Sequence, residues 1–183
     1  MKYSFSTKGW HSNTFEEFCQ VAKELKFQGI ELHNIGNRLF TDVDGAFHDY
    51  TAAATVRKLY EMKLSIPCID TICNTADKST ENQSIEEISK CIEIAANLKI
   101  PYVRIHSGAF ENIEEGAENT ARIIEKVLET AEKKGITILV ETSGIFCNTS
   151  VLRDLLNRFA CDNLAALWDM HCPYFYAGEQ ADD

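Results

Sequence analysis

The sequence has 183 residues, of which 45% are hydrophobic and 25% charged, a balance typical of globular proteins and not of disordered or fibrous ones. Its 18 Lys and Arg against 28 Asp and Glu give a formal net charge of −10, which repels phosphate backbones and anionic membranes. There are seven cysteines but no Cys-x-x-Cys pair, and we find no leader peptide or membrane-length apolar run. These features predict a cytoplasmic protein with reduced thiols and with neither nucleic acid nor membrane as a partner.

Short β-rich runs alternate with longer stretches of helical periodicity along the chain. The expected strands are Tyr3–Ser6, Gly29–His33, Ser65–Asp70, Tyr102–His106, Ile136–Glu141 and Ala165–Met170. Apolar helical faces lie between them at Phe15–Leu25, Ile85–Ala96 and Ile123–Ala131. Thr14-x-x-Glu17 and Ser84-x-x-Glu87 have the capping-box pattern of helix starts, and Lys133-Lys134-Gly135 has the pattern of a helix end. This alternation predicts parallel strands joined by right-handed crossovers.

Two folds are compatible with this pattern, a doubly wound open sheet and a barrel. The first turn, Ser6-Thr7-Lys8-Gly9-Trp10, lacks the Gly-x-Gly of a dinucleotide-binding sheet, which favours the barrel, although a flavodoxin-like order stays open. We therefore predict an α/β fold of the (β/α) TIM-barrel type with about six parallel strand–helix units, in a single domain over residues 1–183. An eight-unit barrel takes about 250 residues, so the last two units are expected to be missing. The nearly continuous apolar runs Ile136–Val140 and Leu164–Trp168 predict strands covered on both faces.

Loop lengths predict where the functional site lies. Helix-to-strand connections are short, whereas the strand-to-helix connections Asn34–Phe47, Thr71–Gln83 and Ser107–Glu114 are long. Long loops persist where they build a site, and ligands bind at the carboxyl ends of parallel strands. We expect the site at those ends.

Ionisable side chains gather at the same strand ends. They are Glu31, His33, Asp70, Arg104, His106, Glu141, Asp169 and His171. Because side chains alternate along a strand, Glu31 and His33 face one way, as do Arg104 and His106. A ring of carboxylates and imidazoles repels itself unless a cation compensates it. Oxygen and imidazole ligands without thiolates suit a divalent ion such as Mn²⁺, Mg²⁺, Co²⁺ or Zn²⁺.

Four motifs carry a resemblance to the sugar phosphate isomerase/epimerase branch of the xylose isomerase-like TIM-barrel superfamily. They are Gly29-Ile30-Glu31-Leu32, Arg104-Ile105-His106-Ser107-Gly108, Leu139-Val140-Glu141 and Leu167-Trp168-Asp169-Met170-His171-Cys172-Pro173-Tyr174. The resemblance implies a metal ion bound by Glu141 and Asp169, completed in the family by a histidine and a glutamate on later strands that this chain does not contain. Members often place a histidine three residues after the aspartate, where this sequence has Cys172, with His171 one place earlier.

The resemblance also implies the chemistry, a metal-dependent sugar or sugar phosphate isomerase or epimerase that transfers a proton next to a carbonyl group. Glu141 would act on the proton, and contacts to the sugar would come from Trp10, Glu31, His33, Arg104, His106 and His171. The opposing glutamate would come from an absent strand, so this chain alone is expected to be inactive. Open strand edges predict a homo-oligomer, or an edge covered by a loop or by the acidic tail Glu179–Asp183.

Other interpretations stay open at this point. A non-catalytic carbohydrate-binding or regulatory barrel is the main alternative, and whether a chain without the last two units keeps the metal is a separate question. An apurinic endonuclease relative is disfavoured by the acidic net charge. At the level of residues, Glu31 and Arg104 could form a structural ion pair, His33 and His106 could be hydrogen-bonded core residues, and Trp10 could line a pocket or close the barrel end.

Overall fold

The computed structural model describes residues 1–10 and 13–180. Its strands are β1 (Ser4–Ser6), β2 (Gly29–His33), β3 (Cys68–Asp70), β4 (Tyr102–Ile105), β5 (Thr137–Glu141) and β6 (Leu164–Leu167). Its α-helices are α1 (Phe15–Glu24), α2 (Arg38–Thr41), α3 (Ala52–Met62), α4 (Glu81–Leu98), α5 (Ile113–Lys134) and α6 (Thr149–Phe159), with short 3₁₀ turns at Lys78–Thr80 and Gly144–Cys147. Every predicted strand is present; the predictions for the third and sixth were too long, because Ser65 makes only an isolated bridge and β6 ends at Leu167.

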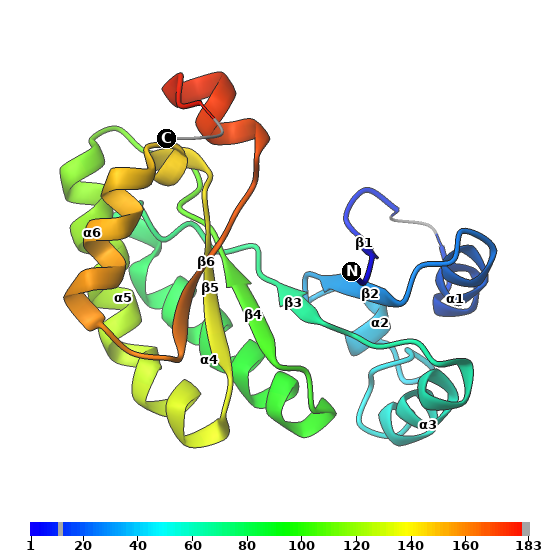
Figure 1. Cartoon of the computed structure of the whole chain (residues 1–183). Coiled ribbons are helices and arrows are strands. Elements are labelled where there is room, and N and C mark those ends of the chain that lie inside the picture. Colours follow the sequence, from blue (N-terminus) through cyan, green and yellow to red (C-terminus); the bar gives the residue numbers. More distant parts are fainter. Residues whose placement is uncertain (11–12, 181–183) are drawn as a thin grey trace.

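The strands form one parallel sheet in the order β1-β2-β3-β4-β5-β6, so each strand pairs with its neighbour in sequence (Figure 1). A doubly wound sheet reverses its order near the middle, whereas consecutive order is that of a barrel wall. The barrel-type prediction is therefore confirmed, and the flavodoxin-like alternative is excluded. No pairing joins β1 to β6 among the described residues, so the wall is an open arc.

Burial distinguishes the two faces of the arc. The outer positions Ile30, Leu32, Ile69, Val103, Ile105, Ile138 and Val140 have no exposed surface, because the helices pack against them. On the inner face Leu139, Ala165 and Leu167 are only half-buried. The expectation that these strands are covered on both faces is therefore wrong for the described residues, since only the outer face has a helical layer.

Local signals set most helix boundaries. Thr14 caps α1 in a complete capping box with Glu17, and Gly135 ends α5 in the left-handed conformation, as predicted. The predicted box at Ser84 is wrong, because α4 begins three residues earlier and Ser84 lies inside it. The side chains of Ser84 and Glu87 instead bond the β3–α4 connection, at the Asn74 carbonyl and the Ile72 amide.

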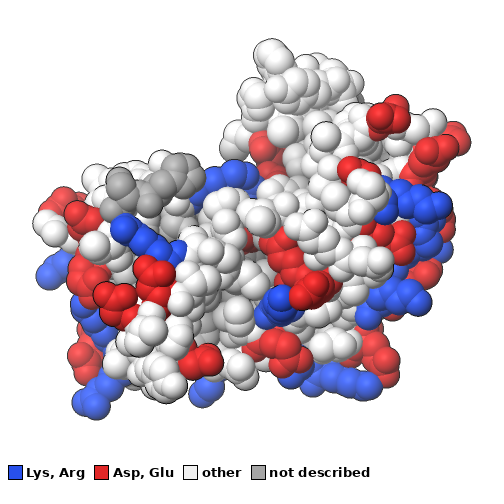
Figure 2. Space-filling view, turned by 180° about the vertical axis from the view of Figure 1, so that it is seen from behind, with Lys and Arg blue, Asp and Glu red and all other residues white. Residues whose placement is uncertain are grey.

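The C-terminal segment projects beyond the sheet, drawn in red in Figure 1. It includes a π-helical turn at Pro173–Ala177, and Tyr174, Phe175 and Tyr176 are all more than 60% exposed. In Figure 2 the projection at the top accordingly shows almost no Lys, Arg, Asp or Glu side chains. Glu179 turns back and caps α6 through the amide and hydroxyl of Thr149, at 2.8 Å each. No helix in the described part of the chain is long and apolar enough to span a bilayer.

Candidate functional site

The register of the sheet brings ionisable side chains from neighbouring strands to one face. His33 of β2 lies opposite Asp70 of β3, and Asp70 lies opposite Arg104 of β4. Glu31 precedes His33 by two residues, and Glu141 closes β5 in the same phase, so both point to the same inner face. This face is the one without a helical layer, and at the carboxyl ends of the strands Glu31, His33 and Arg104 are half-buried whereas Asp70 and Glu141 are buried.

Arg104 is the centre of a charged cluster, which we define as Glu31, Asp70, Arg104, His106 and Glu141. Its guanidinium binds Glu141 through two nitrogens at 2.8 and 3.2 Å, contacts Glu31 at 3.1 Å and lies 3.5 Å from Asp70. Burial opposes the charged form of Arg104, whose side chain is 15% exposed, but the surrounding carboxylates outweigh burial and raise its pKa. The positive charge that this ring of acids requires is therefore supplied by Arg104.

His106, directly after β4, links both sides of the charged cluster. Its Nε2 donates to the Thr71 carbonyl at 2.6 Å and lies 3.4 Å from Asp70, while Nδ1 lies 3.4 Å from Glu141. Burial disfavours its protonation, but the contacts with Glu141, the Thr71 carbonyl and Asp70 together outweigh burial and raise the pKa of His106. For Glu141 burial raises the pKa, yet His106 and Arg104 together lower it to about 2. In this arrangement Glu141 is a weak proton acceptor at neutral pH.

The donor set does not fit a divalent metal ion as it stands. Both oxygens of Glu141 accept hydrogen bonds from Arg104, and Asp169 Oδ1 accepts from the amides of His171 and Cys172. Among the described residues, no group of three or more His, Cys, Asp or Glu side chains is placed to bind an ion. Glu141 and Asp169 end neighbouring strand units, but among the described residues no hydrogen bond or ion pair joins the two side chains.

A second group of predicted residues meets beside the charged cluster. His33 Nδ1 lies 2.8 Å from Asp70 Oδ2, and His33 lines a cavity of about 110 Å³ together with Trp10. Trp10 packs against Phe5 and Phe18 at centroid distances of 6.0 and 6.2 Å, and it is 42% exposed. Trp10 therefore lines a pocket, and His33 combines a buried partner with an accessible ring.

His171 lies apart from the charged cluster. Its ring stacks on Phe175 at 5.2 Å and contacts Tyr176 edge-on, within the projecting C-terminal segment. In the described part of the chain no hydrogen bond or ion pair connects His171 to the charged cluster. The structure thus groups the predicted residues of β2, β4 and β5, places Trp10 next to them, and leaves His171 outside.

Asp70 is the member of the cluster to which the sequence pattern assigned no role. Its side chain is fully buried, and it contacts His33, Arg104 and His106 from three directions. Its position at a strand end, in phase with the other ionisable residues, was visible in the sequence. Its burial was not visible, because burial depends on how the neighbouring strands close over it.

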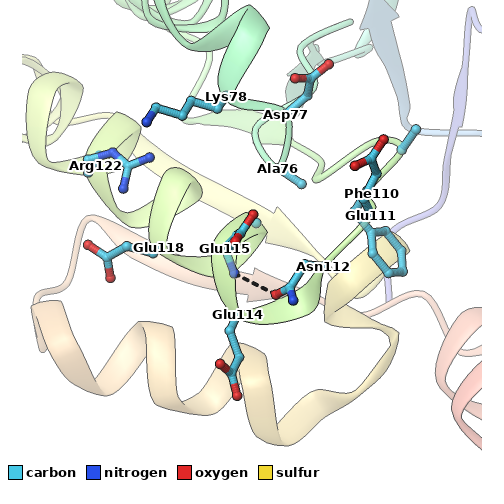
Figure 3. A pocket seen from close by; sticks show the side chains of 12 residues that line it. Ala76, Asp77, Lys78, Phe110, Glu111, Asn112, Glu114, Glu115, Glu118 and Arg122 are labelled. Atoms are coloured by element: carbon cyan, nitrogen blue, oxygen red, sulfur yellow. Dashed lines mark hydrogen bonds between the residues drawn. The ribbon is translucent and has the colours of Figure 1, made fainter.

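A larger cavity of about 800 Å³ lies between the β3–α4 connection and the start of α5 (Figure 3). Asn112 caps α5 there by accepting the Glu115 amide at 3.0 Å, while Lys78 and Arg122 extend along its other side. None of the predicted site residues lines this cavity. The charged cluster and the Trp10 cavity remain the candidate site.

Comparison with known proteins connects this geometry to a family. The family model of the xylose isomerase-like TIM barrel matches residues 19–182. Among curated proteins, the probable endonuclease 4 of Natronomonas pharaonis is 35% identical over 75 residues, which are 40% of this chain and 26% of that protein.

Solved structures share the fold at low sequence identity. The probable 3-DHS dehydratase AsbF of Bacillus anthracis has a TM-score of 0.74 at 20% identity, over 94% of this chain and 64% of AsbF. The D-psicose 3-epimerase of Clostridium cellulolyticum H10, solved with D-tagatose, has a TM-score of 0.77 at 10% identity, over 98% of this chain and 67% of the epimerase. The chain therefore spans about a quarter of the curated relative and about two thirds of these structures.

Proposed function

Because the chain belongs to the xylose isomerase-like TIM-barrel family, we propose that it acts on a sugar or sugar phosphate as an isomerase or epimerase that transfers a proton next to a carbonyl group. The charged cluster supports this most directly, since it gathers carboxylate, imidazole and guanidinium groups at the carboxyl ends of β2 to β5. A similar structure is that of a ketose epimerase with D-tagatose.

In this proposal Glu141 handles the proton and Arg104 regulates Glu141. His106 and Arg104 together hold the pKa of Glu141 at about 2, which suppresses its basicity while both contacts are in place. A phosphate or an oxyanion of the substrate would compete for the guanidinium, because Arg binds such groups with two parallel hydrogen bonds. Releasing Glu141 then raises its pKa and makes it a proton acceptor. Glu31 and His106 are proposed to contact the sugar hydroxyls.

A divalent ion (Mn²⁺, Mg²⁺, Co²⁺ or Zn²⁺) is a separate part of the proposal. Glu141 and Asp169 are the two carboxylates that would contribute to it, and no group of three or more His, Cys, Asp or Glu side chains among the described residues is placed to hold an ion. We therefore assign no step to an ion, and we expect Mn²⁺ to bind the purified chain more weakly than a site with four protein ligands would bind it.

The test is proton exchange in D₂O. The chain is incubated with D-tagatose or D-psicose, with and without Mn²⁺, and the protons next to the carbonyl are followed by NMR. We expect binding, and exchange that is slow because Glu141 is held by Arg104. Glu141→Gln should abolish the exchange, whereas Glu129→Gln, which removes only a surface partner of Lys133, should not. The proposal would be contradicted if the wild-type chain showed no binding and no exchange.

Binding without exchange would instead support a non-catalytic carbohydrate-binding module, the alternative that the ion-paired state of Glu141 favours. The match to a probable endonuclease 4 makes DNA a necessary control ligand. At a net charge of −10 we expect no salt-dependent binding to duplex DNA. A cytoplasmic location remains a prediction.

A further inference from the structure

His33 lies between a buried carboxylate and the small cavity at Trp10. Its side chain is 19% exposed, whereas that of Asp70 is not exposed at all. The backbone of His33 is fixed on both sides, because its amide donates to Thr7 Oγ1 at 2.9 Å and its carbonyl accepts from Asn37 Nδ2 at 2.7 Å. His33 is thus held by two backbone hydrogen bonds and one from its ring, and only Nδ1 of the ring has a partner among the described residues.

We propose that Asp70 is a positioning residue that keeps the proton of His33 on Nδ1, so that Nε2 accepts a proton from a hydroxyl group of a polyhydroxy ligand in the Trp10 cavity. The ligand class rests on the proposed function, whereas the His33–Asp70 geometry does not. His33 would then be a second proton-handling residue, separate from Glu141.

The direction of the His33–Asp70 bond follows from the surroundings of Asp70. Oδ1 faces Arg104 Nε at 3.5 Å and His106 Nε2 at 3.4 Å and has no hydrogen-bond partner in the described chain, so cationic groups surround that oxygen. A carboxylate between such groups accepts hydrogen bonds and donates none. Oδ2 therefore accepts from His33 Nδ1–H, and a neutral imidazole with its proton on Nδ1 has its lone pair on Nε2.

In the proposed transfer, Nε2 of His33 takes the proton of a ligand hydroxyl group. When the hydroxyl O–H bond breaks, its proton forms the Nε2–H bond, the electron pair stays on the ligand oxygen, and the imidazolium pairs with Asp70. The other charged groups facing this region are Glu87 of α4, Arg104 of β4, His106 directly after β4, and Arg38, which lines the cavity. Asp70 lies closest, which makes it the residue that decides the tautomer.

The cavity has the character of a polyol site. Trp10 offers a partly exposed ring face, while His33, Thr7 and Asn37 offer polar groups in the same wall. A volume of about 110 Å³ accommodates a few heavy atoms of a sugar and not a nucleotide. Aromatic faces with a polar rim bind the apolar C–H side of a sugar while its hydroxyls reach hydrogen-bonding groups.

The tautomer can be measured without any activity. Long-range ¹H–¹⁵N NMR on the whole chain should show neutral His33 with its proton on Nδ1, with the signal assigned by His33→Gln. In Asp70→Asn we expect this tautomer to give way to the Nε2–H form. Asp77→Asn is the matched control, because Asp77 follows β3 as well but only caps the Lys78–Thr80 turn at the surface. A wild-type His33 protonated on Nε2 when neutral would overturn the assignment.

Ligand binding supplies the second measurement. In a Trp168→Phe background, D-tagatose should quench the fluorescence of Trp10, and Asp70→Asn should weaken binding at least tenfold while Asp77→Asn leaves it unchanged. Equal binding by Asp70→Asn with an unchanged His33 tautomer would overturn the inference and leave the proposed function intact. No binding of D-tagatose by the wild-type chain, with the Nδ1–H tautomer present, would contradict the proposed function and not the positioning role of Asp70.

Discussion

At the scale of single residues, the site is organised by one cation among three carboxylates. Buried ion pairs contribute little net stability when complete, because desolvation offsets the attraction, but they are costly to break. Arg104 contacts Glu31, Asp70 and Glu141, and all four side chains are less than one-fifth exposed. Removing the cation would leave negative charges facing each other in a place that water reaches poorly.

We therefore predict that Arg104→Met lowers the free energy of unfolding by about 3–5 kcal/mol, measured by urea denaturation at pH 7. Arg153→Met is the matched control, because Arg153 pairs with Asp154 at the surface, where both side chains are more than 60% exposed. The control should change stability by less than about 0.5 kcal/mol. If Arg104→Met lowered the free energy of unfolding by less than about 1 kcal/mol, the guanidinium would not be needed to stabilise the three carboxylates in the folded protein.

The pKa of Glu141 predicts a loss of stability in acid. Its folded pKa of about 2 lies below the ordinary value of 4.5, so its contribution is complete above pH 4.5 and is lost as the pH falls toward 2. The shift corresponds to about 3 kcal/mol. The raised pKa of His106 acts in the opposite direction, since its contribution is complete below pH 6.5 and is lost as the pH rises through the folded pKa.

Urea denaturation between pH 5 and pH 2 measures the acid effect. Glu141→Gln should flatten the loss of stability relative to wild type, because its side chain no longer titrates. Glu129→Gln, at the surface, should keep a slope close to that of wild type. Parallel slopes for Glu141→Gln and wild type would mean that the carboxyl group is not ion-paired in the folded state.

At the scale of elements, the turn after β5 locks β5 to β4. Gly144 has a φ of +57°, and a Cβ placed there would overlap Ser107 Oγ. That hydroxyl accepts the Ile145 amide at 3.1 Å and donates to the Ser143 carbonyl at 3.2 Å. The turn therefore requires glycine for its backbone angle and for the close approach of Ser107, and it fixes the end of the strand that carries Glu141.

Gly144→Ala is accordingly expected to destabilise the protein more than Gly135→Ala. Both glycines have positive φ, but a Cβ at Gly135 meets nothing within 4 Å. Gly135→Ala should cost about 1–2 kcal/mol from its backbone angle alone, and Gly144→Ala about 1–3 kcal/mol more from overpacking. Urea denaturation of both variants checks this, and equal losses would show that Ser107 moves aside without cost.

At the scale of the whole molecule, the arc leaves β1 and β6 as edges, and apolar side chains gather beside β6. Trp168, Met170 and Phe175 are 61%, 73% and 66% exposed. Exposed strand edges and apolar patches both favour association. Glu179, the first residue of the acidic tail, caps α6 and therefore does not cover the edge of β6.

We predict that the chain self-associates through this region. In analytical ultracentrifugation at high concentration, the wild-type chain should show a mass above that of one chain, and Trp168→Glu should lower it. Tyr60→Glu, at an 83% exposed aromatic residue of α3, should not. A strictly monomeric wild-type chain at every concentration would exclude an oligomer.

The sequence by itself determined the alternation of strands and helices, most of their positions and the edge at which ionisable residues gather. These properties are local, because hydrophobic periodicity and capping patterns act within a few residues. The alternation of side chains along a strand is equally local. The sequence alone could therefore place four ionisable residues on one face of the sheet, namely Glu31, His33, Arg104 and Glu141. Ser84 shows the limit of such signals, since its partner was the distant Asn74 carbonyl and not a cap.

Tertiary structure alone decided which groups meet. Arg104 balances the carboxylates, because the register places its guanidinium within reach of three other strands. The same register buries Asp70 against His33 and brings Trp10 to the neighbouring cavity. Such contacts join residues as far apart as 37 positions (His33 and Asp70) and 73 positions (Glu31 and Arg104). They depend on strand order and side-chain length together, which no local pattern in the sequence encodes.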